Sequence, residues 1–157
     1  LLRREVKMLT PTQSEFYLAY MVNSGYSEEV IRFAKKYPNL QIKAYYTLSN
    51  YSLIKNDIKT DTFPFKIVFD HVPTTLLGKL AVDKTMQNQG MGKWMLLDAL
   101  FQSYKIAMLS GSIAVVVEAL NENAANFYQR LGLKLLHDNK YFITMKSIEK
   151  LITEQPN

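Results

Sequence analysis

The sequence contains no cysteine, and this absence removes several classes of site at once. A chain without thiols cannot form disulfide bridges, thiolate zinc sites or iron–sulfur clusters, and it has no cysteine nucleophile. Only two histidines are present, His71 and His137, and they stand alone in the sequence. We therefore expect both to be surface or core histidines, and we predict no metal site.

Long apolar stretches and blocks of one charge are also missing. No apolar run approaches the about 18 residues of a membrane-spanning helix. The basic start at residues 1–4 has no apolar segment behind it, as a secretory signal would require. We therefore expect a cytoplasmic protein without a membrane partner.

Basic residues exceed acidic ones by 19 to 14, which gives a formal net charge of +5. These lysines and arginines are scattered singly along most of the chain. A soluble basic surface would explain the balance, and so would an anionic partner such as phosphate, nucleotide or nucleic acid.

The composition is that of a packed domain, with 157 residues, 48% hydrophobic positions and 12% aromatic positions. This length suits one domain, which we predict to cover residues 1–157. In the front half we expect strands at 4–9, 41–48, 65–69 and 74–82, helices at 14–22 and 27–38, a loop at 49–62 and a turn at 70–73.

The second half carries a stronger pattern. Apolar residues recur at helical spacing from Gly92 to Ser110, and Gly111 suits a left-handed helix end. The β-branched run within 112–120 is typical of a strand covered on both faces. We also expect a helix at 122–131 ending at Gly132, strands at 133–136 and 141–145, and a short helix at 148–154. This order indicates a mixed α/β (α+β) fold with at least one parallel strand pair.

The segment from Val82 to Lys93 leaves a strand, turns through two glycines and opens the long helix. The first amides of a helix have no internal partner and meet the positive end of its dipole. Glycine lets the backbone approach a ligand closely, so the segment resembles a pyrophosphate cradle. A Walker loop and a dinucleotide fingerprint both fail on spacing, since Gln87 and Met95 stand where each needs glycine. A tight turn without a ligand remains the alternative.

A second motif follows the β-branched strand directly. Gln87-x-x-Gly90-x-Gly92 resembles the acetyl-CoA loop of the GNAT family, the Gcn5-related N-acetyltransferases. Asn121-x-x-Ala124-x-x-Phe127-Tyr128-x-x-x-Gly132-Leu133 resembles the second signature of that family. The two motifs stand in the family's order, about thirty residues apart, with a helix and an apolar strand between them. The resemblance covers Leu76 to Met145.

The resemblance implies a central mixed sheet, flanked by helices, that splays open between two parallel strands to admit acetyl-CoA. It places the backbone of Leu80 and Val82 against the pantetheine, where an amide polarises the thioester carbonyl. It also implies that Asn121 and Asn126 face the other side of the cofactor. The complete implied cofactor-binding set is Leu80, Ala81, Val82, Gln87, Asn88, Gln89, Gly90, Met91, Gly92, Lys93, Asn121 and Asn126.

Tyr128 is the candidate general acid, which would protonate the departing thiolate. The alternative is a core tyrosine beside Phe127. Some relatives carry a catalytic glutamate where this chain has Leu76, so that base is absent. Glu118 is a candidate relay, and an outward-facing or paired glutamate is the other interpretation.

The resemblance implies that the acceptor is an amine, and the identity of this amine divides the hypotheses. The strings Leu77–Asp83 and Tyr45–Ser49 resemble GNAT toxins of bacterial toxin–antitoxin pairs, which acetylate aminoacyl-tRNA and are neutralised by an antitoxin partner. Tyr45, Tyr46 and Tyr51 could stack on a base or pack in the core. The alternatives are an N-acetyltransferase acting on a small amine or peptide N-terminus, and a non-catalytic acyl-CoA-binding module. A homodimer is the candidate assembly.

Overall fold

The computed structural model describes residues 16–22, 35, 41–58, 63 and 67–153. The chain divides into two compact units, formed by residues 1–49 with 78–97 and by residues 50–77 with 98–157. The strand expected at 4–9 lies outside the described residues, as does the helix expected at 27–38 except for Lys35, which is helical.

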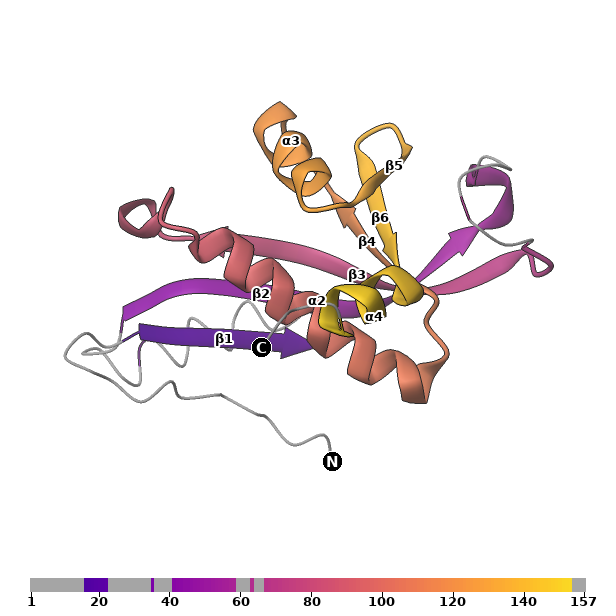
Figure 1. Cartoon of the computed structure of the whole chain (residues 1–157), viewed down its shortest axis with the longest axis horizontal. Helices are drawn as coiled ribbons and strands as arrows, with labels where there is room; N and C mark the ends of the chain where they lie inside the picture. The colour runs from indigo at the N-terminus through magenta and orange to yellow at the C-terminus, as the bar shows by residue number, and fades with distance from the viewer. Residues whose placement is uncertain (1–15, 23–34, 36–40, 59–62, 64–66, 154–157) are drawn as a thin grey trace. The chain divides into compact units, whose positions relative to one another are not determined.

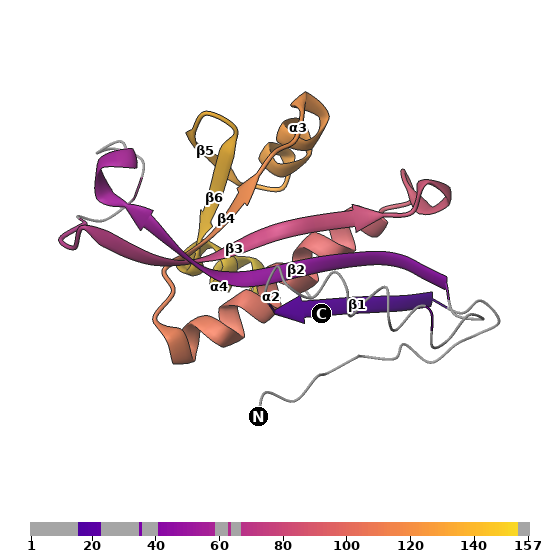
Figure 2. The ribbon, with the colours of Figure 1, turned by 180° about the vertical axis from the view of Figure 1, so that it is seen from behind.

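Strand β1, Phe16–Val22, begins the described part of the first unit. It pairs in parallel with β2, Gln41–Ile54, from Phe16 opposite Gln41 to Val22 opposite Leu48, and Figure 2 shows the two strands side by side. The prediction of a helix at 14–22 was therefore wrong. The segment contains three aromatic residues, which favour strands, and a pairing partner distant in sequence overrides its short helical pattern.

Strand β2 confirms the expected strand at 41–48 but continues to Ile54, so the predicted loop at 49–62 was wrong in its first part. Strand β3, His71–Val82, begins within the predicted turn at 70–73. Pro73 offers no amide hydrogen to the strand, but its carbonyl accepts a bond from the Ile113 amide at 3.0 Å. The strand expected at 65–69 is contradicted at residues 67–69, where the chain is irregular.

The second unit contains the pairings that make the sheet mixed. Strand β3 runs parallel to β4, Ala114–Glu118, with Thr75–Leu77 opposite Val115–Val117. Strand β4 is antiparallel to β6, Lys140–Thr144, which is antiparallel to β5, Lys134–His137. Neighbouring strands are hydrogen-bonded in the order β1-β2-β3-β4-β6-β5. The predicted mixed sheet with a parallel pair is confirmed, and Figure 1 shows β4 beside β6.

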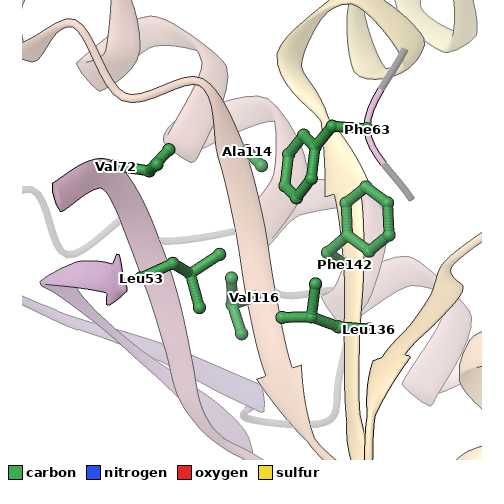
Figure 3. Packing of buried hydrophobic residues seen from close by; sticks show 7 residues of the cluster. All are labelled: Leu53, Phe63, Val72, Ala114, Val116, Leu136 and Phe142. Atoms are coloured by element: carbon green, nitrogen blue, oxygen red, sulfur yellow. The ribbon is translucent and has the colours of Figure 1, made fainter. Parts of the chain in front are cut away.

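Strand β4 lies at the centre of the core of the second unit. Residues Ala114 to Val117 have no measurable exposure, which confirms a strand covered on both faces. Figure 3 shows the packing around it, including a stacked pair, Phe63 and Phe142, with ring centroids 4.5 Å apart. The complete cluster is Leu53, Phe63, Val72, Ala114, Val116, Leu136 and Phe142.

The helices of the second half agree with the sequence pattern. They are α2, Met91–Ser110, α3, Glu122–Arg130, and α4, Met145–Thr153. Gly111 and Gly132 follow α2 and α3 with positive φ angles of 70° and 90°, the conformation that glycine adopts without strain. Among the described helices, none is long and apolar enough to cross a membrane.

Candidate active site

A structured loop joins β3 to α2 in the first unit. It contains a short 3-10 helix, Lys84–Met86, whose start is capped by the Asp83 side chain. An oxygen of this carboxylate accepts from the Thr85 amide at 2.9 Å and also from the Thr85 hydroxyl. These hydrogen bonds, the hydroxyl first, lower the pKa of Asp83 below its usual range, and the Lys43 ammonium at 4.0 Å adds a smaller effect. The carboxylate therefore fixes the entrance of the loop.

Two glutamine side chains hold the loop closed on its own backbone. The side-chain amide of Gln87 donates to the Val82 carbonyl at 3.0 Å, and that of Gln89 donates to the Thr85 carbonyl at 2.9 Å. Between them, Asn88 takes a left-handed φ of 60°, and Gly90 follows at 83°. The loop therefore has a defined shape before any ligand arrives.

The amides at the start of α2 are the groups suited to an anion. The Trp94 amide makes the first helical bond, to the Gly90 carbonyl at 3.1 Å, whereas the Gln87 amide already donates to Lys84 at 3.4 Å. For the amides of residues 88–93, no backbone partner is recorded in the part of the chain that is described. Unpartnered amides at a helix start can cradle a pyrophosphate.

The predicted cofactor-binding residues of this segment lie at or near the surface of the first unit. The side chains of Gln87, Asn88, Gln89 and Lys93 are exposed, and so is Gly90. The remainder are half-buried, namely Leu80, Ala81, Val82, Met91 and Gly92.

Tyr128 lies in the second unit, near the end of α3. Its ring packs edge-on against Phe127, with centroids 5.4 Å apart, and the residue is 8% exposed. Its backbone carbonyl accepts from the amides of Leu131 and Leu133, both at 3.1 Å. Burial raises the pKa of the Tyr128 phenol, because an anionic phenolate loses hydration there. The phenol therefore remains a proton donor across the physiological range.

Asn121 begins the same helix. Its side-chain oxygen accepts from the Ala124 amide at 3.0 Å, so it acts as the N-cap of α3. Asn126 is exposed, and its backbone carbonyl accepts from the Arg130 guanidinium at 3.3 Å. The side-chain oxygen of Asn121 therefore stabilises the start of α3, the helix that carries Tyr128.

Glu118 is exposed and paired, which agrees with the interpretation of an outward-facing or paired glutamate. Its carboxylate accepts from the side-chain amide of Asn139 at 3.1 Å. The same Asn139 amide donates to the Ala119 carbonyl at 3.1 Å, and the Ala119 amide donates back to Asn139. Sequence reasoning missed Asn139. The turn residues Asp138 and Asn139 mark a turn, but nothing in the sequence indicates what that turn holds.

The two histidines and the three tyrosines singled out in the sequence lie partly at the surface and partly in the core. His71 is exposed, with a ring nitrogen 3.5 Å from the Ser52 hydroxyl, and His137 lies 3.0 Å from an Asp138 oxygen. Within the described ranges no group of three or more metal-ligating side chains occurs. Tyr46 is fully buried and Tyr51 packs against the core cluster, so both take the core role, whereas Tyr45 is half-buried.

Comparison with known proteins identifies the class. The "Acetyltransferase (GNAT) domain" family matches residues 60–134, which contain both motifs. AtaT complexed with acetyl-methionyl-tRNAfMet has 32% sequence identity, with 73% of this chain and 69% of that chain covered and a TM-score of 0.65. The chain belongs to the GNAT acetyltransferase family.

Two further relatives belong to the same group of toxins. The tRNA-acetylating toxin of Mycobacterium tuberculosis is 41% identical over 66 residues, 42% of this chain, and the match spans only 40% of that protein. A tyrosine-to-phenylalanine mutant of the AtaT toxin, bound to the C-terminus of the antitoxin AtaR and acetyl-CoA, is 28% identical with a TM-score of 0.61. That match covers 80% of this chain and 79% of the toxin.

Proposed function

We propose that this protein transfers the acetyl group of acetyl-CoA to the amino group of an aminoacyl-tRNA, as the toxin of a toxin–antitoxin pair. The observation that carries the proposal is the similarity to AtaT complexed with acetyl-methionyl-tRNAfMet, which extends over 73% of the chain. The tRNA-acetylating toxin of Mycobacterium tuberculosis supports the same acceptor. A tRNA acceptor also agrees with the net charge of +5 and with a cytoplasmic site of action.

The loop between β3 and α2 binds the pyrophosphate of acetyl-CoA. The amides of residues 88–93 supply the donors, and the positive end of the α2 dipole favours the negative charge. The glutamine bonds to Val82 and Thr85 keep these amides in place without a ligand. The backbone of Leu80 and Val82 aligns the pantetheine.

Tyr128 acts as the general acid of the transfer. The acceptor nitrogen forms a bond to the thioester carbonyl carbon, the carbon–sulfur bond breaks, and the phenol gives its proton to the departing thiolate. Because burial keeps the phenol protonated, the acid is available at neutral pH. A backbone amide at Leu80 or Val82 stabilises the negative charge that develops on the carbonyl oxygen.

The acceptor must lose a proton without a dedicated glutamate. Leu76 has an aliphatic side chain that cannot act as a base, and it is partly buried against the core cluster. Glu118 is exposed, and one of its carboxylate oxygens accepts from the Asn139 side-chain amide. We assign the deprotonation to water, with Glu118 as the candidate relay of the proton to solvent.

The proposal includes a protein partner. The AtaT structure with the C-terminus of AtaR and acetyl-CoA provides the precedent for an antitoxin that binds a toxin of this family. We propose a corresponding antitoxin for this chain, and a homodimer as its own assembly.

The test offers labelled acetyl-CoA to charged tRNA, polyamines and peptides in parallel. We expect label on the amino group of charged tRNA, and we expect Tyr128→Phe to lower kcat by about 10²-fold or more, within the range of a general acid. Phe127→Leu is the matched control, because it removes the neighbouring ring but leaves the phenol. Label only on polyamines or peptides would overturn the tRNA acceptor, and an unchanged kcat in Tyr128→Phe would overturn the acid assignment.

A further inference from the structure

A groove of about 280 Å³ lies in the second unit, beside the β5–β6 hairpin and α4. Its residues come from the turn after α3, from both strands of the hairpin and from the first two turns of α4. The lining consists of Gly132, Lys134, Phe142, Ile143, Thr144, Lys146, Ser147 and Lys150.

Three of these residues are lysines, and none of the lining residues is acidic. Lys134, Lys146 and Lys150 are exposed, and no ion pair to them is recorded within the described part of the chain. The neighbouring acid on α4, Glu149, already accepts from the Tyr104 hydroxyl at 2.9 Å. The lining of the groove therefore has a formal charge of +3 from its three lysines.

The remaining side chains favour a phosphate backbone over a protein surface. Protein-binding surfaces are enriched in aromatic side chains at their centre and depleted in lysine. Here the aromatic and aliphatic lining residues are withdrawn, with Phe142 only 2% exposed and Ile143 only 4%. Lys146 and Lys150 lie one turn apart on α4, about 6 Å along its axis, so their two positive charges lie on the same face of the helix. Flexible lysines bind phosphates in this manner, without reading a sequence.

The groove is connected to the proposed acid through the backbone. Gly132 and Lys134 line it, and the Leu133 amide between them donates to the Tyr128 carbonyl at 3.1 Å. An anionic ligand in the groove would thus lie against the segment that anchors the end of α3. This neighbourhood suits the body of a substrate whose reactive end is presented to Tyr128.

We propose that this lysine groove binds the phosphodiester backbone of the tRNA substrate. The inference rests on the proposed function, since it assigns a second contact surface to the same substrate. The groove adds affinity and salt dependence but no chemistry, so its loss weakens substrate binding and leaves the transfer step intact.

The experiment measures binding of uncharged tRNA by fluorescence anisotropy at several salt concentrations. The variant Lys146→Gln with Lys150→Gln should bind about tenfold more weakly, and the slope of log K against log salt should fall by about 2, one for each lost phosphate contact. The variant Lys134→Gln alone should lower the slope by about 1. The matched control is Lys55→Gln with Lys105→Gln, which removes the same charge from exposed lysines outside the groove and should leave the slope within about 0.5 of the wild type.

Circular dichroism verifies that each variant is folded as the wild type is. The dissociation constant for acetyl-CoA verifies that each variant binds acetyl-CoA as the wild type does. Equal losses in the groove and control variants would overturn the groove, because net charge alone would then explain binding. Unchanged tRNA binding with lost binding of poly-glutamate would overturn it in favour of an acidic protein segment. If the wild-type protein bound no tRNA, both the proposed role of the groove and the proposed tRNA acceptor would be wrong. If the groove variants bound tRNA as the wild type does, only the proposed role of the groove would be wrong.

Discussion

At the scale of single residues, the environment of Tyr128 determines what the phenol can do. The side chain is 8% exposed and packs against Phe127, and burial raises its pKa above the usual value of about 10. A buried tyrosine of this kind is a poor base and a persistent acid. This property suits a group that donates one proton in each turnover and regains it from solvent.

The raised pKa has a measurable consequence in the pH profile. A general acid is active below its pKa, so raising that pKa moves the alkaline loss of activity to higher pH. We expect kcat to show no falling limb between pH 7 and about 10, the usual tyrosine value. The measurement is kcat at saturating acceptor under chemistry-limited conditions. A decline centred between pH 7 and 9 would assign the acid to another group.

At the scale of elements, the start of α3 depends on one side chain. Asn121 has an extended backbone, and its side chain satisfies the Ala124 amide. Replacing an N-cap asparagine by alanine removes that bond and costs about 1 kcal/mol. We therefore expect Asn121→Ala to lower the free energy of unfolding by about this amount, measured by urea denaturation.

Asn123→Ala provides the control for this prediction. It makes the same substitution two residues later, inside the first turn of α3, where no capping bond to the side chain is recorded among the described residues. Alanine has the higher helix propensity, so Asn123→Ala should be neutral or slightly stabilising. Equal destabilisation by the two variants would show that the cap contributes nothing specific.

The elements also show how far the sequence could be interpreted. Strand β4 and helix α2 were predictable because each contains its own signal, a β-branched run and a helical apolar spacing. Strand β1 was not, because its pairing with β2 joins residues more than twenty positions apart. The extension of β2 did leave a local signal. Tyr51 and Leu53 face the core cluster whereas Asn50, Ser52 and Ile54 are exposed, which is the alternation of a strand.

The candidate site was predictable in its motifs but not in its side-chain bonds. The glycines of the loop correctly predicted the start of α2, and the anion-binding role of the amides there remains a prediction. The bonds from Gln87 to Val82 and from Asn139 to Glu118 depend on tertiary structure. Periodicity and motif spacing carry no information about such contacts, and the lysine groove lay beyond sequence analysis for the same reason.

At the scale of the whole molecule, the binding of acetyl-CoA should be visible in stability. A ligand that binds the folded chain and not the unfolded chain raises the free energy of unfolding by about 2.7 kcal/mol at one hundred times its Kd. We expect acetyl-CoA and coenzyme A to raise the midpoint of thermal unfolding in a concentration-dependent manner. Adenosine, which has no pyrophosphate, is the control and should have little effect. An unchanged midpoint at saturating acetyl-CoA would contradict the proposed role of the loop.

Strand β4 sets a limit on how this protein can diversify. Its side chains from Ala114 to Val117 are buried on both faces, and the first exposed one is Glu118. Substitutions inside such a strand are restricted to apolar residues of similar volume, because a larger, smaller or polar side chain disturbs close packing on both faces. New acceptor preferences must therefore arise in the segments that the strand supports, such as the exposed Leu120 after its end, while the strand itself stays a fixed reference during evolution.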